Sequence, residues 1–168
     1  MSFQLNAPQP LLAVHRVDEF ACGEVLLDEW LKRRALANQL SGASRTFVVT
    51  DQDQRVRGYY ALAAGAVSHQ MATSAVRRNM PDPVPDPVPV IVLGRLAVDH
   101  RAHGIKLSAS LLQDAVKRAA AVAQNAGVRA LLVHALHDQA KGFYEHYGFQ
   151  VSPVHPMTLM LRLIDKQP

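Results

Sequence analysis

Two stretches of the chain carry apolar side chains at the three- and four-residue spacing of a helix with one buried face. In residues 22–40, which stop before Gly42, the apolar positions are Leu26, Leu27, Trp30, Leu31 and Leu36. In residues 107–125, which Gly127 is expected to cap, they are Leu111, Leu112, Ala115, Ala119 and Val122. A short helix is expected over residues 139–147, ending at Gly148.

Six other stretches are rich in β-forming or apolar residues and predict strands: 11–15, 44–50, 56–67, 90–98, 128–134 and 157–163. A short polar turn at 51–54 predicts antiparallel pairing of its two flanking strands. The 90–98 strand is the most apolar, which indicates burial on both faces. It is followed by the long helix and then by another strand, an order that gives parallel strands. We expect an α+β fold with a mixed, mostly antiparallel sheet, a central parallel strand pair and flanking helices.

Residues 68–88 show neither a helical nor a strand period. Prolines occupy every second position from Pro81 to Pro89, and the repeat Pro81-Asp-Pro-Val84, Pro85-Asp-Pro-Val88 is a tandem duplication. Because proline has no backbone N–H, this run cannot form a sheet ladder and is expected to be extended, polyproline-like backbone. Neither side is large enough to stand well alone, so we expect a surface connection within one domain over residues 1–168.

The composition is that of a globular protein. Hydrophobic residues make up 49% and charged residues 19% of the 168 residues, which excludes a disordered chain. The single cysteine, Cys22, excludes a disulfide framework and a cysteine-rich zinc site, and it favours a reducing compartment. No stretch approaches the roughly 18 consecutive apolar residues of a membrane helix. The N-terminus lacks a secretory pattern, and no histidine and carboxylate spacing indicates a metal site. We expect a cytoplasmic protein that makes no membrane contact and binds no metal.

Charge is unevenly distributed along the chain, whose formal net charge is +4. Residues 1–31 carry a net −4, residues 32–78 a net +6 and the remainder a net +2. A basic middle segment suggests a face for a polyanion such as nucleic acid or a nucleotide cofactor. Ordinary solvated faces are the alternative explanation of the same charges.

The junction between the 90–98 strand and the helix after it, residues 95–108, is the part of the pattern that indicates a ligand site. In open sheets, ligands bind beside the carboxyl ends of parallel strands. The free N–H groups and the positive dipole end of the helix suit a pyrophosphate, and Lys106 adds a charge. Every strand–helix turn offers some of this, so an ordinary connection is the alternative.

Two segments carry a resemblance to a known family. Leu93-Gly-Arg-Leu-Ala-Val-Asp99 precedes the junction, and Ala140-Lys-Gly-Phe-Tyr-Glu-His-Tyr-Gly-Phe149 follows the second parallel strand. With the loop after the first segment, they resemble the Gcn5-related N-acetyltransferases, the GNAT superfamily, over nearly the whole chain. The resemblance implies the GNAT fold and acetyl-CoA as the co-substrate.

The pyrophosphate loop of that family, Gln/Arg-x-x-Gly-x-Gly/Ala, corresponds here to residues 103–108. Lys106 and Ser108 stand where the family has its two glycines, and a side chain there can crowd the approach of the backbone to the phosphates. The cofactor-binding residues that the resemblance implies are Leu96, Ala97, Val98, His103, Gly104, Ile105, Lys106, Leu107 and Ser108.

A narrower resemblance rests on residues 22–32, 41–49, 77–83, 93–99 and 156–159. In this order they are similar to the TacT-type GNAT toxins of bacterial toxin–antitoxin pairs, from which the doubled Pro-Asp-Pro-Val departs. Such enzymes acetylate the α-amine of the amino acid on charged tRNA and so stop translation. The resemblance implies aminoacyl-tRNA as substrate, a ribbon-helix-helix antitoxin as partner, and a homodimer.

Tyr144 matches the family's tyrosine near the thioester sulfur, which implies that it acts as a general acid. The alternative is a core aromatic beside Phe143. An α-amine has a pKa of ~7.7–8.0, so a strong general base is dispensable. A backbone N–H near the end of the 90–98 strand can polarise the carbonyl.

Other polar groups near these segments are expected to have lesser roles. We expect Tyr147 to pack the helix end, and His134 and His137 to be simply hydrogen-bonded. His100 and His103 are expected to contact phosphate or water.

For tRNA, the leading candidates are Arg77 and Arg78, which flank the irregular stretch. Lys32, Arg33, Arg34 and Arg45 follow them, although a solvated helix face explains residues 32–34 equally well. Glu29 is a candidate for selecting the amino acid. Two other functions stay open: acetylation of a small amine, against which the basic middle segment argues, and a degenerate GNAT with a binding role only.

Overall fold

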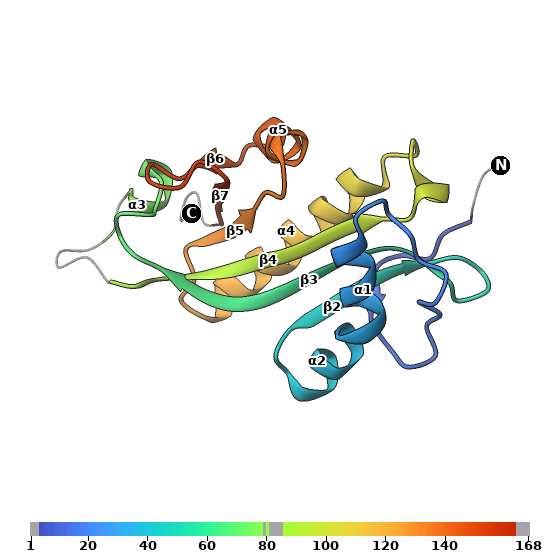
Figure 1. Ribbon diagram of the computed structural model, residues 1–168. Coiled ribbons are helices and arrows are strands. Elements are labelled where there is room, and N and C mark those ends of the chain that lie inside the picture. Colours follow the sequence, from blue (N-terminus) through green and yellow to red (C-terminus); the bar gives the residue numbers. More distant parts are fainter. Residues whose placement is uncertain (1–3, 79, 81–85, 164–168) are drawn as a thin grey trace. The chain divides into compact units, whose positions relative to one another are not determined.

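Seven strands and five α-helices are present in the residues that the computed structural model describes, 4–78, 80 and 86–163 (Figure 1). The strands are β1 (Gln9–Pro10), β2 (Arg45–Thr50), β3 (Val56–Val67), β4 (Val88–Val98), β5 (Ala130–His134), β6 (Gln150–Val151) and β7 (Thr158–Arg162). The helices are α1 (Val25–Arg33), α2 (Ala35–Ser41), α3 (Ser74–Arg77), α4 (Leu107–Asn125) and α5 (Asp138–His146), and η1 (His100–Ala102) is a short 3-10 helix.

The strands form one sheet in the order β1-β2-β3-β4-β5-β7-β6. The pairs β1–β2, β2–β3, β5–β7 and β6–β7 are antiparallel, whereas β4 and β5 are parallel. The predicted α+β class, the mostly antiparallel sheet and the central parallel pair are therefore confirmed. The parallel register places Val90 opposite Ala130 and Leu93 opposite Val133.

The chain divides into two compact units. The first comprises the described residues of Met1–Ala63 and Gly94–Ala115, and the second those of Ala64–Leu93 and Val116–Pro168. Strands β3 and β4 and helix α4 each contribute residues to both units.

The core of the first unit forms where α1 and α2 meet the sheet. Helix α1 packs on α2, and α2 packs on β2. Tyr59 on β3 is fully buried, and its hydroxyl donates a hydrogen bond of 2.6 Å to the carbonyl oxygen of Leu27, which ties α1 to the sheet. The buried side chains of this cluster are Leu11, Phe20, Leu31, Ala35, Val48, Val56, Tyr59 and Ala97.

The core of the second unit lies around β7, against which α3 and α5 pack. Arg162 on β7 donates to the carbonyl of Ala75, and the Ser152 hydroxyl donates to the carbonyl of Met71, so polar groups fix α3 and the loop before it. The buried side chains here are Val67, Ala72, Val76, Val88, Val90, Ala130, Leu132 and Met160.

The helix predicted over residues 22–40 is wrong in its continuity, because the chain forms two helices there. Arg34 has φ −121° and ψ −31°, outside the helical region, and separates α1 from α2. Gly23 has a left-handed φ of 99°, and the Asp28 carboxylate accepts the N–H of Cys22, so α1 begins at Val25 rather than Cys22. The predicted end is confirmed: Gly42 adopts a left-handed φ of 82° after Ser41.

The strand predicted over residues 11–15 is also wrong. The N–H of Leu12 donates to Nδ1 of His15 and the N–H of His15 donates to the carbonyl of Leu12, so the backbone closes a turn. The short strand β1, Gln9 and Pro10, pairs with β2, and the N–H of Leu11 donates to the carbonyl of Thr46 before the turn begins. The irregular segment 68–88 contains the short helix α3, which the Thr73 hydroxyl caps by accepting the N–H of Val76, and β4 begins within that segment at Val88. Residues 81–85, part of the expected polyproline-like run, lie outside the described residues.

The long helix has the predicted bounds, 107–125, and its stripe is nearly as predicted. Leu111, Leu112, Ala115 and Ala119 are buried, but Val122 is 40% exposed and Ala123 is buried instead. At 3.6 residues per turn, the position four residues after Ala119 faces the core more closely than the one three residues after it. Gly127 does not adopt a left-handed φ, so it is not a helix cap of the predicted kind.

A buried ion cluster lies at the end of β4. The side chain of Arg57 is 4% exposed and donates to the Asp51 carboxylate at 3.0–3.1 Å, while its Nη1 lies 3.6 Å from the fully buried Asp99. Burial by itself raises the pKa of Asp51, but the N–H groups of Arg55 and Asp53 and the Arg57 guanidinium outweigh it, so this pKa lies below its usual value. Arg57 is thus held between two carboxylates.

We expect Asp51→Asn to lower the free energy of unfolding by about 3 kcal/mol, because it leaves a buried arginine with one carboxylate fewer. Since the pKa of Asp51 is lowered by folding, its contribution is present above the unfolded pKa of ~3.9 and is lost as the pH falls through the folded value. Urea titrations at pH 7 and at pH 3 measure both effects. Asp53→Asn, at an exposed position of the same turn, is the control; equal losses in the two variants would contradict the prediction.

Candidate functional site

The loop after β4 is fixed to the first unit through Asp99. Its carboxylate accepts the N–H of Arg101 at 2.9 Å, which caps η1, and the N–H of Ala21 at 3.0 Å. The N–H of His100 donates to the carbonyl of Ala21 at 2.8 Å. These bonds to the same short segment hold the start of the loop against the region that precedes α1.

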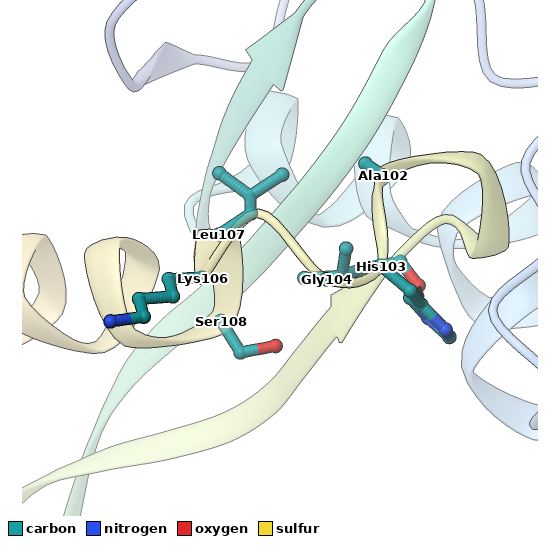
Figure 2. Close-up of a pocket in the computed structure, with 7 residues that line it drawn as sticks. Ala102, His103, Gly104, Lys106, Leu107 and Ser108 are labelled. Carbon is teal, nitrogen blue, oxygen red and sulfur yellow. Dashed lines mark hydrogen bonds between the residues drawn. The ribbon is translucent and has the colours of Figure 1, made fainter. Parts of the chain in front are cut away.

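A cavity of about 380 Å³ opens between this loop and the start of α4 (Figure 2). Its lining contains six of the nine predicted cofactor residues and one that the sequence did not indicate, Ala102, which is buried under the loop. Leu96 and Ala97 lie upstream on β4 and Ile105 is 47% exposed, so these three do not line it. The lining residues are Val98, Ala102, His103, Gly104, Lys106, Leu107 and Ser108.

The backbone of the loop follows a path that favours glycine at two places. Gly104 has φ +85°, with no atom within 4 Å of the place where a Cβ would lie. Lys106 has φ +59°, in the left-handed region, although it is not a glycine. In Figure 2 the Ser108 hydroxyl points to the side of His103, whereas the exposed Lys106 side chain extends the opposite way. The first N–H groups of α4 have no acceptor within the helix and can bind an anion.

Both histidines of the loop use a ring nitrogen within the protein. Nδ1 of His100 lies 3.0 Å from the carbonyl oxygen of Ala21, and Nε2 of His103 lies 2.9 Å from that of Val98. One ring nitrogen of each histidine is thus occupied, and contact of the other nitrogen with phosphate or water stays a prediction. His103 ties the loop back to β4 while it lines the cavity.

Tyr144 lies on α5, in the second unit, and is 8% exposed. Its ring contacts Phe143 and Phe149, at centroid distances of 5.3 and 5.4 Å. Burial raises the pKa of Tyr144 to about 12, so the hydroxyl keeps its proton at neutral pH. Within the described residues this hydroxyl has no hydrogen-bond partner, which leaves it free to donate to a ligand.

The neighbours of Tyr144 have the predicted lesser roles. Nδ1 of His134 lies 2.9 Å from the Thr158 hydroxyl, and the His137 ring accepts the N–H of Ala140 and caps α5. Tyr147 is 44% exposed and packs on Phe143 at 5.1 Å, after which Gly148 ends the helix with φ +94°.

A second cavity, of about 370 Å³, lies in the second unit and is basic. It is lined by Arg77 and Arg78, which the sequence indicated, and by His69 and Ser74, which it did not. Nε of Arg77 is buried and has no hydrogen-bond partner. Arg129 donates instead to the backbone carbonyls of Val76 and Arg78, so it fixes the cavity wall.

The other predicted tRNA residues are spread over the first unit. Exposed Arg33 and half-buried Glu29 pair at 2.5 Å on α1, and Lys32 lies on the same helix. Arg45 donates to the carbonyl of Gln39 at 2.7 Å, and Arg34 is the break between α1 and α2. The structure therefore groups Arg77 with Arg78 but gives Arg33 and Arg45 partners within the protein.

The described residues contain neither a metal-binding group nor a membrane-spanning helix. No group of three or more histidine, cysteine or carboxylate side chains there could hold a metal ion. No helix in the same residues is long and apolar enough to cross a membrane.

Known proteins share this architecture. Residues 15–157 match the acetyltransferase (GNAT) domain. The chain is 50% identical over 160 residues to the tRNA-acetylating toxin of Mycobacterium tuberculosis (strain ATCC 25618 / H37Rv), covering 95% of this chain and 93% of that protein.

Two solved structures show the same fold. AtaT complexed with acetyl-methionyl-tRNAfMet matches with a TM-score of 0.85 and 24% identity, covering 95% of each chain. A tyrosine-to-phenylalanine mutant of the AtaT toxin, bound to the C-terminus of the antitoxin AtaR and to acetyl-CoA, matches with a TM-score of 0.79 and 22% identity, covering 95% of this chain and 93% of that one.

We expect Lys106→Gly to raise the free energy of unfolding by about 1 kcal/mol, because glycine removes the cost of a left-handed side-chain-bearing residue. Lys106→Ala removes the same charge but keeps the strained φ, so it serves as the matched control. Urea unfolding of both variants tests this, and a Lys106→Gly variant no more stable than Lys106→Ala would contradict it.

Proposed function

Because the chain belongs to the GNAT acetyltransferase family, we propose that it transfers the acetyl group of acetyl-CoA to the α-amine of the amino acid on charged tRNA, and so acts as a toxin that blocks translation. The observation that carries the substrate is the 50% identity, over nearly the full length of both chains, to a tRNA-acetylating toxin. A cavity at a helix N-terminus and a second, basic cavity fit a nucleotide co-substrate and an RNA substrate.

Acetyl-CoA, when bound, supplies the acyl thioester. We assign its pyrophosphate to the cavity lined by residues 98, 102–104 and 106–108, since the first N–H groups of α4 and the open space at Gly104 favour an anion close to the backbone. Lys106 keeps the backbone conformation that glycine favours, so the loop path fits despite the substitution. We assign the backbone of Leu96, Ala97 and Val98 to the acyl and pantetheine part, and Ile105 and Leu107 to the loop's apolar contacts.

The chain's own groups have two chemical tasks in this reaction. A backbone N–H near the end of β4 polarises the acyl carbonyl as negative charge develops on its oxygen. Tyr144 donates its proton to the leaving thiolate, a role that its hydroxyl supports, since it is protonated at neutral pH and has no hydrogen-bond partner among the described residues. The attacking α-amine, with a pKa of ~7.7–8.0, is already partly neutral at pH 7 and needs no strong base.

We assign the basic cavity in the second unit to the tRNA backbone. Arg77, with a buried and unpartnered Nε, and Arg78 contribute the charge, and phosphate is the acceptor that suits both. Lys32, Arg33 and Arg45 add weaker, exposed contacts, and Glu29, through its pair with Arg33, contributes to selection of the amino acid.

Three further features complete the proposal. The partner is a ribbon-helix-helix antitoxin whose tail covers the toxin, in keeping with AtaT bound to the C-terminus of its antitoxin AtaR. The active form is a homodimer. The site of action is the cytoplasm, where charged tRNA occurs.

We expect Tyr144→Phe to lower kcat for acetylation of aminoacyl-tRNA by about 10²- to 10⁴-fold, because it removes the general acid. Tyr147→Phe, an exposed tyrosine on the same helical segment, is the control and should retain activity. The assay is transfer of labelled acetyl from acetyl-CoA to a pool of charged tRNA.

The pH dependence adds a second readout to this experiment. Activity of the parent should rise up to about pH 8, as the α-amine loses its proton, and should not fall by pH 10, because the pKa of Tyr144 is about 12. Full activity of Tyr144→Phe would refute the acid role but keep the substrate. No label on tRNA from the parent would refute the proposed function.

We expect Arg77→Ala to raise KM for aminoacyl-tRNA about tenfold and to reduce the dependence of log affinity on log salt by about one unit, since one phosphate contact is lost. Lys117→Ala, an exposed cation on α4, should leave both values unchanged. Binding titrations between 50 and about 200 mM salt provide the slopes. An unchanged slope in Arg77→Ala would remove this cavity from the tRNA interface.

A further inference from the structure

Arg95 on β4 holds an unusual position for a charged side chain. It is half-buried, and its guanidinium carbon lies 4.2 Å from the centre of the Trp30 ring. Burial lowers the pKa of Arg95, with Tyr59 opposing the change, yet a guanidinium stays charged at any physiological pH. Among the described residues it has no hydrogen bond and no ion pair.

The ring beneath Arg95 is rigidly supported. Trp30 stacks on Tyr59 with an interplanar angle of 12°, and Phe20 meets the Tyr59 ring edge-on at 5.5 Å. The Tyr59 hydroxyl is bound to the carbonyl of Leu27. The guanidinium carbon lies over the ring, and no acceptor among the described residues takes its N–H donors, so these donors are available to a ligand.

The nearby carboxylates of α1 already have other partners. Asp28 accepts the N–H of Cys22 at 2.9 Å, and Glu29 is paired with Arg33. Arg95 therefore keeps its charge and its donors for a ligand that brings acceptor oxygens. A planar fork of N–H donors is the arrangement that recognises phosphate and carboxylate groups in two-point contacts.

The position of Arg95 on β4 indicates which phosphate group of the substrate it can contact. Side chains of residues 95 and 97 lie on the same face of the strand, and Ala97 belongs to the core cluster under α1. Arg95 is three residues before Val98, which is about 10 Å along a strand. The backbone between them is where we assigned the acyl group. The amine that attacks this group is carried by the last nucleotide of tRNA, so the phosphodiester next to that nucleotide comes within one nucleotide of the reacting atoms.

We propose that Arg95, whose guanidinium lies over the Trp30 ring, binds the last phosphodiester of the tRNA 3′ end and so places the aminoacyl group at the acyl site. This inference rests on the proposed function and names the contact that selects an RNA-borne amine over a small free one. Arg95 acts on the position of the substrate and not on the chemistry of the reacting bonds.

The test uses the only tryptophan of the chain as its reporter. Trp30 fluorescence is titrated with the trinucleotide CpCpA and, separately, with adenosine, which has no phosphate. We expect saturable quenching by CpCpA, an affinity about 10- to 100-fold weaker in Arg95→Ala, and an intermediate value in Arg95→Lys. Arg16→Ala, which removes an exposed arginine of the same unit, should change the affinity less than twofold.

Several outcomes would overturn the proposal. The first three are no response of the parent to CpCpA, equal affinity in the parent and Arg95→Ala, and equal affinity for CpCpA and adenosine. The fourth is quenching by a poly-glutamate peptide but not by CpCpA, which would assign Arg95 and Trp30 to a protein partner. Thermal unfolding of each variant shows whether Arg95→Ala is folded, and Arg95→Lys keeps the test valid if it is not.

A kinetic measurement separates this inference from the proposed function. Arg95→Ala should raise KM for aminoacyl-tRNA about 10- to 100-fold and leave KM for acetyl-CoA unchanged. Arg95-dependent CpCpA binding without acetylation of charged tRNA would refute the proposed function and keep the contact. Acetylation by the parent with the same KM in Arg95→Ala would refute the contact and keep the function.

Discussion

The buried contact between Arg57 and its two carboxylates fixes the geometry on which the first unit depends. Asp99, fully buried, receives the Arg57 guanidinium, caps η1 and accepts the N–H of Ala21. Buried charges are stable only when each one is paired, so the positions of these three side chains are closely fixed. The loop that lines the first cavity therefore starts from a fixed point at the end of β4.

The same loop has a left-handed backbone conformation, which glycine usually adopts, at a position that is not glycine. Gly104 and Lys106 both have a left-handed φ, but only the first is glycine. The Asp99 bonds and the contact of His103 with the Val98 carbonyl set the path from outside, and Lys106 bears a cost of about 1 kcal/mol in following it. Lys106 therefore has a left-handed φ, which favours glycine, at a position where the sequence departs from the family's glycine pattern.

The arginines differ in how far their guanidinium groups are already bound by other groups of the chain. Arg57 is paired with carboxylates and Nη2 of Arg129 donates to carbonyls of the chain, although Nε of Arg129 has no partner, and Arg33 pairs with Glu29. Arg77 has a buried Nε without an acceptor. Arg95 lies over the Trp30 ring, and it has no carboxylate partner among the described residues. The net charge of a segment includes all of these arginines equally. Only their partners in the folded chain decide which of them are available to a polyanion.

The sequence by itself determined those features that local pattern and short-range sterics control. The spacing of apolar residues gave the bounds of α4, the polar turn gave the β2–β3 hairpin, and Gly42 and Gly148 ended their helices where a left-handed residue was needed. The family motifs indicated most of the residues that line the cavity at the start of α4. These depend on contacts between residues a few positions apart, which a linear pattern records.

The tertiary structure decided what depends on partners distant in the chain. The side chain of His15 closes a turn where a strand was expected, and Arg34 interrupts a helix whose apolar spacing continues across it. Ala102 lines the cavity because Asp99 folds η1 over it, and Arg95 meets Trp30 only because α1 is tied to β3 through Tyr59. Each of these outcomes is set by a hydrogen bond or a ring contact whose partner the local sequence pattern does not identify.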